Sequence, residues 1–203
     1  MRPNVIDIDV ADADLTGFLS NATGATWTIA TTAPTDGLAH QVSIRNDTAN
    51  DHSAKTAVLT GTDANNAVLT ETVTLPAGSA TVESTGYFKT LTTVVPSATI
   101  GADTMDIGWV DEVSSITYQI DWCSPYACNI SVDVTGTIDF TVQETFVDIQ
   151  NTAPLWVNIS ALASKTADTT SVAAIGATAI RVIVNSYSSG GELQMYTSQA
   201  SSC

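Results

Sequence analysis

The stretch Ala179–Thr197 reads AIRVIVNSYSSGGELQMYT and has the clearest strand pattern in the chain. Apolar side chains recur at every second position on both sides of a turn, which predicts two strands with one buried face each. They are Ile180, Val182, Val184, Leu193 and Met195. Gly190 and Gly191 supply the positive φ angles of a tight turn, so we predict a closing β-hairpin. Because a lone hairpin is marginal in water, it must complete a larger sheet.

The composition is that of an all-β protein. Of 203 residues, 44% are hydrophobic and 13% charged, which favours folding over disorder. Turn signals recur about every ten residues after residue 25, which is typical of a sandwich or barrel. The Thr-rich interval 161–177 is predicted to be a loop with a short strand. The length suits two domains of about a hundred residues, so we expect two β-sandwich or jelly-roll-like domains in tandem.

The domain boundaries follow from pauses in the strand pattern. Four aspartates, at positions 7, 9, 12 and 14, crowd the N-terminus and predict a solvated acidic arm over residues 1–20. Such carboxylates can also gather Ca²⁺, but the run has neither the Gly hinge nor the terminal Glu of an EF-hand loop. A polar interval at 111–115 then separates two strand series. We therefore expect an N-terminal sandwich over 21–112 and a C-terminal one over 113–203.

The charge balance excludes whole classes of partner. Six Lys and Arg face 21 Asp and Glu, a formal net charge of -15. Six scattered cations cannot neutralise a run of phosphates, so nucleic acid and anionic membranes are poor partners. The N-terminus reaches Asp7 and Asp9 before any apolar signal region forms, and no apolar run approaches the length of a membrane span. We expect a protein made in the cytoplasm without a signal peptide.

Histidine offers little evidence of catalysis. The triplet Asp51-His52-Ser53 contains triad residue types, but a triad assembles from separate loops, so we expect His52 to be an exposed turn residue. His40 is expected on the solvent face of a strand. Nucleophile-elbow, dinucleotide and phosphate-loop motifs are missing from the sequence, and the histidines and cysteines do not have zinc spacing. We therefore expect neither an enzyme nor a cofactor.

Acidic pairs are equally unspecific. Glu71 with Glu83, or Asp139 with Glu144, could be imagined as the two carboxylates of a glycosidase. With 21 acidic residues such pairs arise by chance, and we expect them to be incidental. Glu144 occupies a core-facing position in its strand, which suggests a bulge or a rim position there.

The three cysteines leave two interpretations open. Cys123 and Cys128 bracket the sequence SPYA, and a disulfide can clip this short loop in an oxidising environment. Two reduced thiols beside a turn are about as compatible with the sequence. Cys203 is the last residue, and we expect a free thiol on the tail.

Aromatic residues are divided between core and surface. Three tryptophans fall on inward strand faces, and they are Trp27, Trp109 and Trp122. Trp156 lies out of phase with Leu155, Val157 and Ile159, which we expect to point inward. It can therefore form an intersubunit contact or stack on a sugar ring. Tyr187 and Tyr196, on the outer face of the last strands, are similar interface candidates.

Two segments resemble small β-rich structural proteins of tailed bacteriophages. Residues 61–94 read GTDANNAVLTETVTLPAGSATVESTGYFKTLTTV, in which a polar turn leads to ETVT, a Pro/Gly turn and a YFKTLT strand. Residues 134–149 read VTGTIDFTVQETFVDI and are followed by a lone Trp and by the AIRVIVNS and GGEL strands. The resemblance implies a virion protein and brings no catalytic residues.

From this resemblance we expect a capsid-decoration (cement) protein. It would bind the major capsid protein or other virion proteins on the outer surface of the particle, and it would form homo-oligomers. The alternative is a neck, tail or fibre-associated adhesion module that binds host glycan through Trp156 and nearby Tyr. A hydrolase of unknown type is a third hypothesis, which needs a pocket with two perturbed carboxyl groups.

Overall fold

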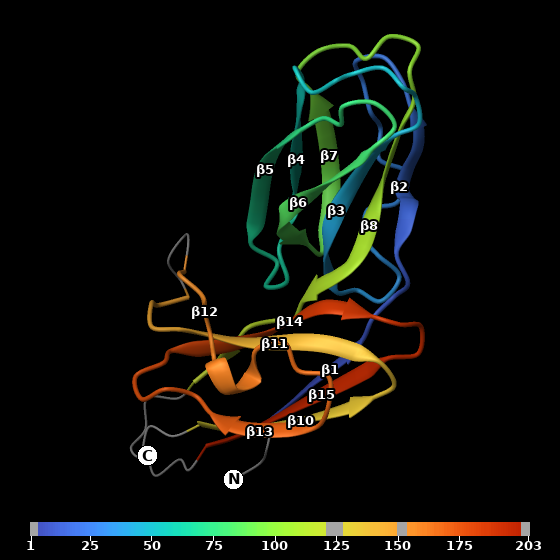
Figure 1. The fold of residues 1–203 in the computed structure, drawn as a ribbon. Helices are drawn as coiled ribbons and strands as arrows, with labels where there is room; N and C mark the ends of the chain where they lie inside the picture. Colours follow the sequence, from blue (N-terminus) through green and yellow to red (C-terminus); the bar gives the residue numbers. More distant parts are fainter. Residues whose placement is uncertain (1–3, 121–127, 150–153, 200–203) are drawn as a thin grey trace. The chain divides into compact units, whose positions relative to one another are not determined.

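Strands form nearly all of the regular structure in the computed structural model, which describes residues 4–120, 128–149 and 154–199 (Figure 1). In these ranges the helical structure is limited to one 3-10 turn, η1 (Ser160–Leu162), and none of it could reach across a lipid bilayer. The predicted all-β class is therefore confirmed. The chain divides into unit 1 (Met1–Val10 with Ser114–Cys203) and unit 2 (Ala11–Val113).

Unit 2 is a β-sandwich. One sheet has the order β5-β4-β7, and the other contains β8-β3-β6 with β2 paired to β8. In β4, Ala57 and Leu59 are buried while the alternating Val58 is exposed, so the every-second-residue pattern sets the inner face. Trp27 and Trp109 lie in the core, as predicted. The strands are β2 (Asp14–Ala22), β3 (Ala39–Asn46), β4 (Thr56–Thr62), β5 (Val68–Thr74), β6 (Thr81–Phe88), β7 (Thr90–Pro96) and β8 (Met105–Ser114).

Unit 1 is a second sandwich of antiparallel strands. Sheet A has the order β1-β15-β10-β13. Sheet B has the order β12-β11-β14, with β9 also paired to β14. The strands are β1 (Asn4–Asp9), β9 (Tyr118–Gln119), β10 (Cys128–Thr135), β11 (Ile138–Thr145), β12 (Val157–Asn158), β13 (Thr169–Val172), β14 (Ala179–Tyr187) and β15 (Glu192–Gln199).

The predicted closing hairpin is wrong, although both of its strands exist. β14 lies in sheet B and β15 in sheet A, so the turn at 188–191 carries the chain across the core from one sheet to the other. The connection from β10 to β11 crosses in the same way. The two crossings are in contact: the N–H of Ser188, in the β14–β15 connection, donates to the carbonyl of Thr137, in the β10–β11 connection, at 2.9 Å. Buried Val182 and Met195 therefore line the core from two different sheets.

The predicted acidic arm is also replaced by strands. β1 pairs with β15 along its whole length, and Ile6 and Ile8 are buried on its inner face. β2 then enters unit 2, where Phe18 is fully buried. In β1, Asp7 and Asp9 lie on the solvent face, and the opposite face is apolar. Unit 1 is thus built from both ends of the chain, and the second division falls after Val113, next to the predicted boundary. The predicted pause at 111–115 is wrong, however, because strand β8 continues through it to Ser114.

Other local predictions have mixed outcomes. The interval 161–177 has loop, part of η1 and the short strand β13, as expected. Leu155 and Val157 do not point inward, since 72% and 43% of their surface is exposed, whereas Ile159 is buried. The register shift in β11 falls between Asp139 and Phe140 rather than at Glu144. Trp122 lies outside the described residues.

Candidate functional site

His40 belongs to a buried network in unit 2 and is not on a solvent face. It shares the inner face of β3 with Val42, and its side chain is fully buried. Nδ1 donates to the carbonyl oxygen of Val110 at 2.7 Å, because a carbonyl oxygen can only accept. Nε2 lies 2.8 Å from Oδ2 of Asp36. The sequence prediction failed because the imidazole counts as polar in an alternation pattern, although two partners allow it to be buried.

Asp36 connects this histidine to the start of unit 2. Its Oδ2 also accepts the N–H of Ala11 at 2.7 Å, and Oδ1 accepts that of Leu38 at 2.9 Å. Burial alone would raise the pKa of Asp36, but the hydrogen bonds from His40 and Ala11 outweigh it and hold the pKa below its ordinary value. The pair therefore anchors the loop before β3.

His52 is likewise buried rather than exposed. Its Nε2 lies 2.7 Å from Oδ2 of Asp103, and its Nδ1 accepts a hydrogen bond from Nζ of Lys55 at 3.1 Å. Asp103 also accepts two hydrogen bonds from Asn50, which, ahead of the bond from His52, holds the pKa of this carboxyl below its usual range. The sequence neighbour Asp51 instead accepts the N–H of Ser53. The partner of His52 is remote in sequence, so no local motif could reveal it.

Three of the carboxylates considered from the sequence, Glu71, Asp139 and Glu144, accept backbone or amide hydrogen bonds. Glu71 accepts the N–H groups of Thr85 and Gly86 at 2.7 and 2.8 Å. In unit 1, Oε2 of Glu144 accepts the N–H of Ala174 at 2.7 Å, which explains a buried carboxylate on an inward position. The described residues contain no group of three or more His, Cys, Asp or Glu side chains arranged to hold a metal ion.

Trp156 lies at the β12 end of sheet B. Its half-buried indole ring has the guanidinium carbon of Arg181 4.5 Å from the ring centroid, which is cation–π geometry. Nε of Arg181 donates to Gln143 at 2.9 Å, and Gln143 donates to Asn158 at the same distance. A polar row across three strands thus fixes the cation against the ring.

Leu155 and Val157 flank this tryptophan in sequence and, by strand alternation, point to the other side of the segment, where both are exposed. The register pairs Glu144 with Val157, so Phe146, two residues beyond Glu144, and Leu155, two before Val157, follow along the same two segments. Phe146 is 50% exposed. We call Phe146, Leu155, Trp156 and Val157 the β12 patch. It lies beside a two-residue edge strand, a short edge of the kind that limits strand pairing but leaves side chains free for contact.

The three predicted interface residues do not form one surface. Tyr187 ends β14 opposite Ile138, at the other end of the β11–β14 pair from Trp156. Tyr196 lies on the outer face of sheet A, and its hydroxyl donates to Oε1 of Gln194 at 2.6 Å. Both tyrosines are half-buried. Each candidate is on the surface, as the sequence indicated, but the two sheets separate Trp156 from Tyr196.

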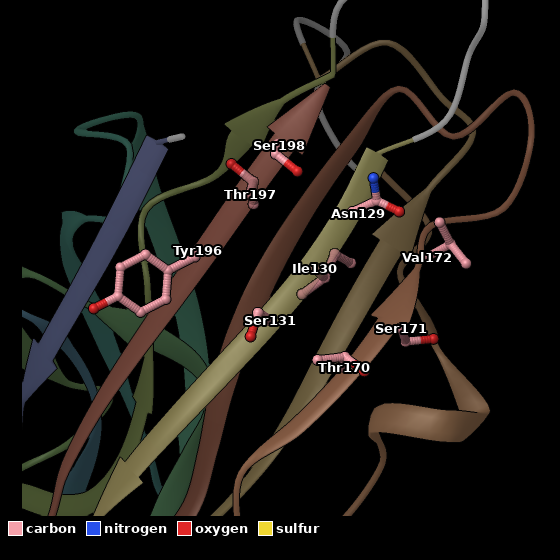
Figure 2. Close-up of a pocket in the computed structure, with 9 residues that line it drawn as sticks. All are labelled: Asn129, Ile130, Ser131, Thr170, Ser171, Val172, Tyr196, Thr197 and Ser198. Carbon is pink, nitrogen blue, oxygen red and sulfur yellow. The ribbon is translucent and has the colours of Figure 1, made fainter. Parts of the chain in front are cut away.

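Tyr196 instead lines a hollow of ≈410 Å³ on sheet A. Figure 2 shows its side chains, which come from β10, β13 and β15. The sequence analysis missed this site, since the hydroxyl-bearing residues of three separate strands meet only when the register is known. The lining residues are Asn129, Ile130, Ser131, Thr170, Ser171, Val172, Tyr196, Thr197 and Ser198.

Cys128 begins β10 with a fully buried side chain. Burial raises the pKa of its thiol to about 11, which makes the reactive thiolate scarce at neutral pH. Cys123 and Cys203 lie outside the described residues. The pairing of Cys123 with Cys128 therefore stays a prediction.

Comparison of the chain with protein-family models, curated proteins and solved structures gave no match.

Proposed function

We propose that this chain is a structural protein of a tailed-bacteriophage virion that decorates the outer surface of the head and stabilises the shell. The observation that supports this most is the β12 patch, an edge of sheet B where Trp156 packs on Arg181 and where three apolar side chains of the same two segments are also exposed. Trp and Arg are the residue types that most often dominate the energy of a protein interface. A cement protein acts by such contact area and needs no reacting groups.

Charge and histidine environment agree with a scaffold role. A net charge of -15 keeps a protein at high surface density soluble. The two histidines, His40 and His52, each hold a loop of unit 2 through a carboxylate partner. In this proposal the β12 patch contacts the major capsid protein or a second copy of the chain, and the acidic remainder faces solvent.

The proposal is tested on particles purified from the encoding phage. Quantitative mass spectrometry should find the chain in a copy number comparable to that of the major capsid protein, and imaging should place it on the head. A few copies per particle, or a position at the tail, would refute decoration. Sedimentation velocity of the free protein tests self-association.

A rebinding assay connects the role to the patch. Purified chain is added to heads that lack it, and Trp156→Ala should weaken binding by about tenfold or more because it removes the central aromatic contact. Val68→Ala is the matched control, because Val68 is an exposed apolar residue of unit 2 with 81% of its surface accessible. Equal binding by both variants would show that the β12 patch is not the contact.

A further inference from the structure

We propose that the hollow on sheet A binds a neutral saccharide. Its outward side chains form two cross-strand rows, set by the antiparallel register. One row is Tyr196, Ser131 and Thr170, and the other is Ser198, Asn129 and Val172. Side chains directly opposite each other on neighbouring strands point to the same face, so the rows bring the polar groups of Asn129, Ser131, Thr170 and Ser198 onto one surface, with the Tyr196 ring at its β15 border (Figure 2).

The polar groups of this floor are available to a ligand. No hydrogen bond joins the side chains of Asn129, Ser131, Thr170 or Ser198 to another residue within the described ranges. A hydroxyl both donates and accepts, and a carboxamide offers each function on a separate atom. This is the complement of a sugar, whose hydroxyls also do both. The volume of ≈410 Å³ lies within the range of small-ligand sites.

Tyr196 supplies the apolar contact that sugar recognition requires. Its hydroxyl is held by Gln194, so the half-buried ring loses little further freedom when a ligand packs against it. Val172, 51% exposed, provides apolar surface in the other row. A ring face bordered by hydroxyls suits the mixed polar and apolar faces of a pyranose.

The uncharged lining of the hollow and the carboxylates near it on sheet A favour a neutral ligand. Apart from the tyrosine phenol, the lining residues carry no ionisable side chain. Asp133 follows Ser131 on the same face, and Asp7 and Glu192 are exposed farther along this sheet. These carboxylates repel sialylated or phosphorylated sugars. A peptide would use an open strand edge rather than this face, since backbone pairing needs unpaired N–H and C=O groups.

The experiment uses the full chain and a defined panel of sugars. Saturation-transfer NMR is recorded with the methyl glycosides of glucose, galactose and mannose, with N-acetylglucosamine, and with two charged probes, 3′-sialyllactose and glucose 6-phosphate. At least one neutral sugar should bind, and the charged probes should bind more weakly. In a separate titration of the isotope-labelled protein, the sugar-induced changes in backbone amide chemical shift should concentrate at residues 129–131, 170–172 and 196–198.

Variants distinguish this hollow from any other surface. Tyr196→Ala should weaken binding by about tenfold, and Ser131→Trp, which fills the floor, should abolish it. Thr135→Trp is the matched control, because Thr135 is exposed on the same face of β10 but outside the hollow. Trp156→Ala is a second control on the other sheet. Circular dichroism confirms that each variant is folded.

Three results would overturn the proposal. These are no binding by any neutral sugar, binding that survives Ser131→Trp, or stronger binding of the charged probes. If Ser131→Trp does not fold, the amide-shift map of the wild-type protein still decides, because shifts away from the hollow would locate the ligand elsewhere.

Discussion

The two stacked crossings of unit 1 predict a graded response to three glycine substitutions. Gly136 has a φ of +77°, and a Cβ there would lie 2.9 Å from the carbonyl oxygen of Gly190 and 3.2 Å from Cα of Gly191. Gly190 has a φ of +82°, but its Cβ would meet open space. At Gly191, where φ is not in the left-handed region, the Cβ would lie 2.7 Å from the carbonyl oxygen of Thr137. Alanine substitutions at the three positions thus separate the free-energy cost of a positive φ angle from the cost of steric contact between the added Cβ and the other crossing.

The expected magnitudes follow from these two terms. Alanine in the left-handed region costs roughly 1–2 kcal/mol, and the stiffer unfolded chain offsets about 0.4–1 kcal/mol, so Gly190→Ala should lower the free energy of unfolding by about 1 kcal/mol. Gly191→Ala should cost about 1–3 kcal/mol by overpacking alone. Gly136→Ala combines both terms and should cost about 2–4 kcal/mol.

The assay must report on unit 1, because a chain with two units can unfold in more than one step. Urea titration followed by hydrogen-exchange mass spectrometry gives the stability of peptides from β11 and β14, which flank the crossings. Peptides from β4 in unit 2 are the internal control and should keep their wild-type midpoint.

Two outcomes would refute the reasoning. If Gly136→Ala costs no more than Gly190→Ala, the two crossings are not in close contact. If instead Gly190→Ala is the most harmful of the three, the conformational term dominates and the packing of one crossing on the other contributes little.

Three further predictions concern buried polar groups. Because folding lowers the pKa of Asp36, its carboxylate stabilises unit 2 above the ordinary aspartate pKa, and this contribution is lost as the pH falls through the lowered value. Asp36→Asn should therefore cost about 1–3 kcal/mol near neutral pH and flatten the acid limb of the stability profile, whereas an unchanged acid limb would contradict the His40 pairing. Glu144→Ala should cost about 1–3 kcal/mol by leaving the N–H of Ala174 unpaired, and Glu144→Gln should cost less; equal denaturation midpoints would argue against this bond. With reductant present, the Cys128 peptide should resist alkylation at pH 8 until the protein is unfolded, and rapid labelling of the native protein would show that the thiol is accessible.

The sequence predicted strands and their inner faces more reliably than their partners. In 179–197 both strands and their buried residues are as expected, but the same alternation arises whether two strands pair in one sheet or face each other across a core. The turn did not decide between these cases, since glycine at 190 and 191 suits either. Only the register, which depends on β10, β11 and β1, distinguishes them.

The N-terminal error has a similar physical origin. Four aspartates crowd positions 7 to 14, so the sequence predicts a solvated arm there and not a strand that pairs with the end of the chain. The segment NVIDID nevertheless carries the signal, because Ile6 and Ile8 alternate with aspartates that occupy the solvent face. The density of aspartates obscures this alternation in the sequence.

The candidate surfaces were also only partly predictable from the sequence. Trp156 could be singled out because it breaks the phase of its neighbours, but Arg181, its partner, is remote in sequence. The hollow on sheet A had no sequence signal beyond Ser and Thr on solvent faces, which is common in strands. The hollow forms only where β10, β13 and β15, which are distant in sequence, pair side by side.

The two surfaces of unit 1 are suited to different partners because the described cations of the unit lie on the side of sheet B only. Among the described cations of this unit, Lys165 pairs with β11 and Arg181 lies on β14, both in sheet B, whereas Asp7, Asp133 and Glu192 project from sheet A. Contact through the β12 patch would leave the acidic face and its hollow open to solvent. Attachment to a particle and capture of a neutral sugar would then not compete, since neither uses the residues of the other.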